Sequence, residues 1–112
     1  MKYHNILPID RKTAFAIFES NNVEKICHAL LSITFYDSDW RWVQEICLKL
    51  LASDNHNISS LAATCLGHIA RIHKTLDKDR VVSALYSKIN TCQENKGSIE
   101  DALEDIEIFL KE

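Results

Sequence analysis

The stretch VEKICHALL at residues 23–31 returns as VQEICLKLL at residues 43–51, and this repetition decides the fold. Both copies share the pattern V-x-x-I-C-x-x-L-L. The shared positions are i, i+3, i+4, i+7 and i+8, which lie on one face of a helix with about 3.6 residues per turn. Each copy therefore predicts an amphipathic α-helix with one apolar stripe.

Weaker copies of the pattern follow at LAATCLGHI (61–69), VVSALYSKI (81–89) and IEDALEDIE (99–107). The copies begin at 23, 43, 61, 81 and 99, so the step alternates between 20 and 18 residues. This alternation indicates a helical hairpin of 38 residues, in which 23, 61 and 99 are equivalent and 43 and 81 are equivalent. Two-helix units of about 35–47 residues are typical of α-solenoids. Chance similarity between amphipathic helices is the alternative.

The composition supports a helical fold. The chain has 112 residues, with 46% hydrophobic and 26% charged, as expected for a single globular domain over 1–112. It contains only two glycines and one proline, whereas β-architectures rich in turns use both residue types repeatedly. We therefore expect an all-α fold, built as a right-handed stack of antiparallel helical hairpins with about five to six helices.

The helix expected after Asn57 differs from the others. Its side opposite the stripe carries Ala63, Gly67 and Ala70 in place of charged residues. A glycine inside a helix costs about 1 kcal/mol relative to alanine, so we expect another segment to approach this side closely. A second layer of helices is the expected neighbour, which would make this the central and most buried helix. A docking groove for a partner is the alternative.

The charge balance bears on the class of partner. The net charge is −3, which gives no basic footprint for nucleic acid and favours a basic protein partner. The start, MKYHNILPID, lacks a signal-peptide pattern, and the run ALLSITFY at 29–36 is too short to cross a membrane. Four cysteines without CxxC spacing indicate reduced thiols. We expect a cytoplasmic protein that binds neither nucleic acid nor membrane.

The stretch from Trp40 to Ile89 resembles HEAT-repeat proteins. In SDNHNISSLAATCLGHIA, a turn with an Asp leads into an alanine-rich helix that ends in Leu-Gly and an aliphatic residue. The positions that carry the resemblance are Asp54, Ala62, Ala63, Leu66, Gly67 and Ile69. The chain departs from the family at Ser59 or Ser60, where a basic residue often bridges to a turn Asp.

Two further stretches, HIARIHKTLD (68–77) and EDALEDIEIFL (100–110), are similar to small bacterial HEAT-like proteins of toxin–immunity loci. Some immunity proteins of contact-dependent inhibition (CDI) systems are of this kind. The resemblance implies a HEAT-like domain that presents a partner-binding surface and carries no chemistry of its own.

The cysteines and histidines do not predict a catalytic or metal site. Cys27, Cys47 and Cys65 occupy equivalent slots of successive helices, whose axes should lie about 8–10 Å apart, whereas zinc holds its sulfur ligands at about 2.3 Å. They are expected to be structural thiols. His68 and His73 are five residues apart and lack a nucleophile or glutamate at a suitable spacing. We expect no metal, no cofactor and no enzymatic activity.

Two clusters are candidates for partner binding. The first lies around YDSDWRW at 36–42, where Asp39, Trp42 and Glu45 combine an aromatic anchor with acidic groups. The alternative for Trp42 is that it packs on a neighbouring hairpin. The second is an acidic face near the C-terminus, made of Asp101, Glu104 and Asp105. Such carboxylates can dock on a basic surface, although a solvated terminal face explains them as well.

Two functional hypotheses follow. The first is an immunity protein, monomeric when free, that neutralises a cognate toxin, expected to be a basic nuclease, by tight one-to-one binding. The second is a HEAT-like adaptor or scaffold subunit of a larger assembly. A cofactor-handling HEAT protein is a third and weaker possibility, because no segment resembles a cofactor site.

Overall fold

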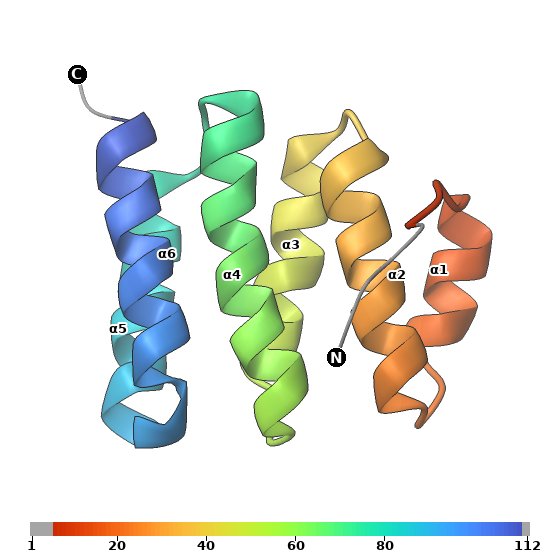
Figure 1. Cartoon of the computed structure of the whole chain (residues 1–112), viewed down its shortest axis with the longest axis horizontal. Helices are drawn as coiled ribbons and strands as arrows, with labels where there is room; N and C mark the ends of the chain where they lie inside the picture. Colours follow the sequence, from red (N-terminus) through yellow and green to blue (C-terminus); the bar gives the residue numbers. More distant parts are fainter. Residues whose placement is uncertain (1–5, 111–112) are drawn as a thin grey trace.

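The computed structural model describes residues 6–110, which form six α-helices and one short 3₁₀-helix, with no strand in this range (Figure 1). The elements follow one another along the chain as α1 (Arg11–Phe18), α2 (Val23–Tyr36), α3 (Trp40–Leu51), α4 (His56–His73), α5 (Lys78–Thr91), η1 (Gln93–Asn95) and α6 (Lys96–Phe109). The expected all-α fold is confirmed.

The helices form two layers. In one layer α4 packs between α2 and α6, and these three helices run in the same direction (Figure 1). The second layer contains α1, α3 and α5, which run the opposite way. The closest sequential pairs are α1 with α2, α3 with α4 and α5 with α6, so the molecule is a stack of three antiparallel hairpins. The predicted equivalence of 23, 61 and 99, and of 43 and 81, is confirmed because equivalent helices share a layer.

Side-chain caps fix where the helices begin. The carboxylate of Asp10 accepts a hydrogen bond from the Thr13 backbone N–H at 2.7 Å, and Asn22 caps α2 in the same way. Such caps satisfy backbone donors that have no partner inside the helix. The expected start of α4 at Asn57 is wrong, because the side-chain oxygen of Asn55 accepts from the Ile58 N–H and begins the helix earlier.

The central helix is α4, as expected. Its fully buried residues are Ala62, Ala63, Cys65, Leu66, Ile69 and Ala70. A Cβ placed on Gly67 would lie 3.3 Å from the Ala102 Cα, so the glycine allows α6 to approach closely. The predicted close approach is confirmed, although the neighbour belongs to the same layer. Within 6–110, no helix is both long and apolar enough to cross a membrane.

The departure from the HEAT pattern at Ser59 and Ser60 has a structural counterpart. The Asn95 side-chain amide nitrogen donates hydrogen bonds to the Ser59 and Ser60 hydroxyl oxygens at 3.0 and 2.6 Å. Asn95 is fully buried, so these bonds tie η1 to the beginning of α4. Neutral hydrogen bonds therefore link these elements at the positions where HEAT-repeat proteins often have a basic residue.

Candidate partner-binding site

Trp42 lies half-buried on α3, where it packs against α1. Its ring meets Phe15 edge-on, with ring centroids 5.8 Å apart and planes at 70°. The Arg11 guanidinium lies 4.3 Å from the Trp42 ring centroid in a cation–π contact. The expectation that Trp42 packs on a neighbouring hairpin is confirmed, and its role in partner binding stays a prediction.

Asp39 already has two partners within the chain. One carboxylate oxygen accepts a hydrogen bond from the Trp42 backbone N–H and caps α3, and the other pairs with Arg11 Nη2 at 3.2 Å. Arg11 also binds Asp37, with Nη2 at 3.1 Å from Oδ1. Hydrogen bonding from Arg11 lowers the pKa of Asp37 below its ordinary value. These contacts join α1 to the turn between α2 and α3.

Glu45 also has an ion-pair partner within the chain. Both of its carboxylate oxygens accept hydrogen bonds from Arg80 of α5, at 2.5 and 2.6 Å. This pairing lowers the pKa of Glu45 and raises the pKa of Arg80. A bidentate arginine–carboxylate pair fixes the geometry of both side chains, so Glu45 links α3 to α5 in the free protein.

The acidic face of α6 is different. Asp101 and Glu104 are exposed, and Asp105 is half-buried beside α4, where its Oδ2 would lie 3.1 Å from a Cβ on Gly67. Among residues 6–110, none of these three carboxylates forms an ion pair. No close cation from the described part of the chain therefore compensates their negative charge.

The two candidate clusters do not meet. Asp39 and Trp42 contact α1, at one end of the stack, whereas Asp101, Glu104 and Asp105 belong to α6 at the other end (Figure 1). Glu45 faces α5 on the second layer. The six predicted residues therefore do not form one continuous surface patch.

His68 of α4 lies between α2 and α6. Its ring centroid is 5.3 Å from that of Phe35, and its Nδ1 lies 2.7 Å from Arg71 Nη2. Burial is the main cause that lowers the pKa of His68; the charge on Arg71 lowers it further, and the charge on Asp105 opposes both. The lowered pKa favours the neutral form of the imidazole. Within the described residues, the hydrogen-bonding partner of His68 is Arg71, which is not a nucleophile.

Four exposed apolar side chains were missed by sequence reasoning. They occupy the last two positions of the three helices of one layer: Phe35, Tyr36, Ile72 and Ile108. A signal for them exists in the sequence, since an apolar residue near the end of each of three equivalent helices is unusual at exposed positions. This signal can be recognised only after the ends of the helices are known.

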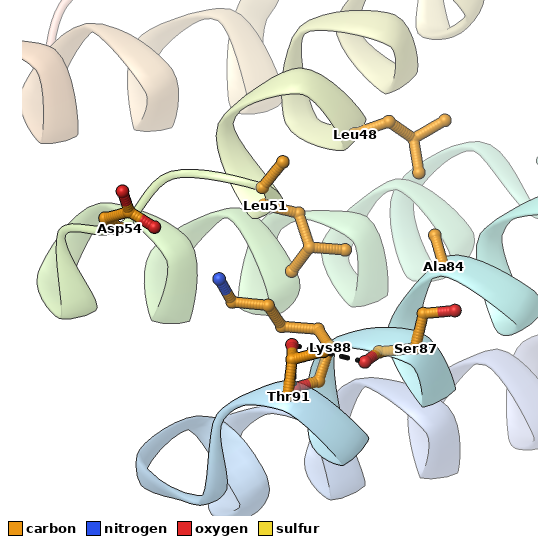
Figure 2. Close-up of a pocket in the computed structure, with 8 residues that line it drawn as sticks. Leu48, Leu51, Asp54, Ala84, Ser87, Lys88 and Thr91 are labelled. Atoms are coloured by element: carbon orange, nitrogen blue, oxygen red, sulfur yellow. Dashed lines mark hydrogen bonds between the residues drawn. The ribbon is translucent and has the colours of Figure 1, made fainter.

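The second layer contains a groove of about 400 Å³ between α3 and α5. Figure 2 shows Leu48 and Leu51 of α3 on one side of it. The facing residues from α5 are Ala84, Ser87, Lys88 and Thr91. The Lys88 ammonium donates to the Ser53 carbonyl oxygen at 3.0 Å, so the cation beside the groove is already bound. No group of three or more potential metal ligands occurs in residues 6–110.

No protein-family model matches the chain, and no curated protein gives a significant match. Among solved structures, a chain of the "Crystal structure of CDI complex from Cupriavidus taiwanensis LMG 19424" is 33% identical to this chain, with a TM-score of 0.84. The match covers 97% of this chain and 96% of that chain. It supports the resemblance to CDI proteins, whereas membership of the HEAT-repeat family stays a prediction. The chain belongs to the same protein family as this component of a CDI complex.

Proposed function

We propose that the chain is an immunity protein of a CDI system, which binds a cognate toxin domain and blocks its activity without catalysing a reaction. The observation that carries this proposal is the likeness to a chain of a CDI complex over nearly the whole length of both chains. A small helical stack whose α6 carboxylates form no ion pair within residues 6–110 suits the inhibitor better than the toxic component, because such groups can bind a basic surface of a partner.

The proposed partner is a toxin domain with a basic surface, such as a nuclease, bound one-to-one in the cytoplasm by a monomer. The three α6 carboxylates support this choice because they form no ion pair with any other residue in 6–110. A negative patch facing a positive one speeds association and selects the partner. Proteins that bind nucleic acids, including nucleases, need cationic surfaces to hold phosphates.

Asp39, Trp42 and Glu45 are proposed as a second and weaker contact. Their present partners, Arg11 and Arg80, would have to exchange with groups of the toxin domain. Because each exchange replaces one ion pair by another, it contributes less affinity than an unpaired carboxylate does. The acidic face of α6 is therefore expected to dominate the electrostatic part of binding.

A charge-reversal experiment tests this proposal. In one variant Asp101, Glu104 and Asp105 are replaced by lysine. In a control with the same change of net charge, the exposed residues Glu19, Glu24 and Asp79 are replaced by lysine. Binding to the toxin domain encoded in the same locus is followed by surface plasmon resonance at low and high salt.

We expect the α6 variant to associate more slowly by at least about tenfold at low salt, with a weaker salt dependence. The control should change association much less. A co-expression assay should show that the wild-type chain protects cells from the toxin domain. Absence of binding and protection by the wild-type chain would exclude immunity and favour an adaptor role.

A further inference from the structure

The end of the α2–α4–α6 layer forms an apolar edge, which we define as Phe35, Tyr36, Ile72 and Ile108. These side chains are between 43% and 57% exposed. Each lies in one of the last two positions of its helix, and the three helices run in the same direction in one layer (Figure 1). The four residues therefore gather at the same end of the layer.

Contacts between neighbouring helices place three of these residues at comparable heights in the layer. The Phe35 ring meets His68, and Ile72 follows His68 by four residues, which places it one helical turn further on the same face of α4. Asp105 packs against Gly67, and Ile108 follows Asp105 by three residues. Phe35, Ile72 and Ile108 thus span α2, α4 and α6 at similar heights.

The other exposed large apolar residues are Leu7, Phe15 and Tyr86. Phe15 is in ring contact with Trp42, and the Leu7 carbonyl oxygen accepts a hydrogen bond from Ser32. Tyr86 lies on α5 beside a separate groove that Leu103 and Ile106 of α6 also line. Four of the seven exposed large apolar residues in the described chain therefore lie at one end of a single layer, and such clustering is typical of interaction sites.

The charges next to this edge define the chemistry of its partner. Within the described chain, α6 carries five acidic residues without an ion pair: Glu100, Asp101, Glu104, Asp105 and Glu107. On α4, Arg71 hydrogen-bonds to His68, and Lys74 lies 4.3 Å from the Phe109 ring centroid. The surface is apolar at the helix ends and strongly negative along α6.

We propose that the apolar edge and the α6 carboxylates together form the docking surface for the toxin domain. The complementary surface would carry apolar side chains bordered by lysine or arginine residues. This inference rests on the proposed function and adds the apolar part of the interface to it. Protein interfaces commonly combine an apolar centre that excludes water with a charged rim.

The α3–α5 groove fits such a partner less well. It combines Asp54 with Lys88, whose ammonium already binds Ser53, so it offers no excess of negative charge. It also lies on the second layer, away from the unpaired carboxylates of α6. Charge complementarity therefore favours the apolar edge with the α6 carboxylates over the α3–α5 groove.

The edge variant and its matched control use neutral substitutions, so that hydrophobic contact is separated from charge. The double variant Ile72→Gln, Ile108→Gln removes apolar surface from the edge with a good helix former. The matched control Leu7→Gln, Tyr86→Gln removes two exposed apolar side chains elsewhere, and Ser87→Arg obstructs the α3–α5 groove. Circular dichroism and urea unfolding verify that every variant is folded.

Binding of the full chain to the co-encoded toxin domain is measured by surface plasmon resonance, and the mass of the free chain by analytical ultracentrifugation. We expect the edge variant to raise Kd at least about tenfold, mainly through faster dissociation. Its salt dependence should stay that of the wild-type chain, because no charge changes. The control and Ser87→Arg should stay within about twofold.

Three results would overturn the inference. Unchanged affinity of the edge variant, with normal binding by the wild-type chain, would leave the immunity proposal standing and remove the edge from the interface. Loss of binding in Ser87→Arg alone would assign docking to the α3–α5 groove. A wild-type dimer that becomes a monomer in the edge variant, with unchanged toxin affinity, would make the edge a self-association surface.

Discussion

Gln44 of α3 and Asp77 at the start of α5 form a closed pair of hydrogen bonds. The Gln44 Nε2 donates to Asp77 Oδ2 at 2.9 Å, and its Oε1 accepts from the Asp77 backbone N–H at 2.7 Å. Gln44 is fully buried, and Asp77 makes no side-chain cap with its own helix. One glutamine therefore fixes the entry of α5 relative to α3.

The first prediction concerns this pair. Replacing Gln44 by methionine keeps the approximate volume but removes both hydrogen bonds, so we expect a loss of about 1–2 kcal/mol in the free energy of unfolding. The control Gln93→Met alters an exposed glutamine and should change stability by less than about 0.5 kcal/mol. Urea unfolding measures both. Equal stability of the two variants would show that the pair does not fix α5.

The second prediction compares the two glycines. Gly67→Ala gains about 1 kcal/mol in helix propensity, but its Cβ would lie 3.1 Å from Asp105 Oδ2 and 3.3 Å from the Ala102 backbone. Shifting α6 should outweigh the gain, because overpacking costs about 1–3 kcal/mol.

Gly97→Ala is the matched control, since its added Cβ would meet no atom within 4 Å apart from its chain neighbours and its own helix backbone. It should stabilise the protein by about 0.5–1 kcal/mol. Thermal and urea unfolding should therefore move in opposite directions for the two variants. A gain of similar size at Gly67 would mean that α6 is not held against this glycine.

The third prediction concerns pH. Because Arg11 lowers the pKa of Asp37 in the folded protein, the ion pair adds stability that is present above the unfolded pKa of about 3.9. That stability is lost as pH falls through the lower, folded pKa. The difference in stability between the wild-type chain and Arg11→Gln should therefore be largest near neutral pH and shrink toward pH 2.

Urea unfolding at several pH values between about 7 and 2 measures this difference. The contact of Arg11 with Trp42 is lost at every pH, so the pH-dependent part reports the ion pair. Lys25→Gln provides the control, because Lys25 is exposed and forms no ion pair within the described residues. A difference independent of pH would rule out a stabilising Arg11–Asp37 pair.

The fourth prediction concerns the thiols. Cys27, Cys47 and Cys65 are buried, whereas Cys92 is only partly buried. Burial raises the pKa of Cys47 and keeps it as the unreactive thiol. We expect one thiol of the native chain to react quickly with Ellman's reagent and the other three only on unfolding. Cys92→Ser should remove the fast phase, and its persistence would disprove the assignment.

The hairpin register could be predicted from the sequence because burial imposes a period on apolar residues. Val23 and Val43 begin stripes that become α2 and α3, and the alternating step places them in different layers. That period does not predict with which neighbouring helix each helix forms its hairpin. α3 packs more extensively on α4 than on α2, and this pairing depends on the shapes of the packed faces.

The candidate site also has features that the sequence could predict and features that it could not. The spacing of Asp101 and Asp105 was enough to place both on one side of a helix, since helical geometry is local. The partners of Asp39 and Glu45 could not be predicted, because Arg11 and Arg80 come from other helices, 28 and 35 residues away. Only the packed stack shows which carboxylates are already paired.

By itself, the sequence determined the helices, their apolar faces, their equivalence in a repeated unit and the acidic character of the last one. These properties follow from local periodicity and composition. Tertiary structure decided which helices pair, which charges are neutralised and where apolar side chains stay exposed, as Phe35, Ile72 and Ile108 do at one end of a layer. Those outcomes depend on contacts between residues distant in the chain, which no local pattern encodes.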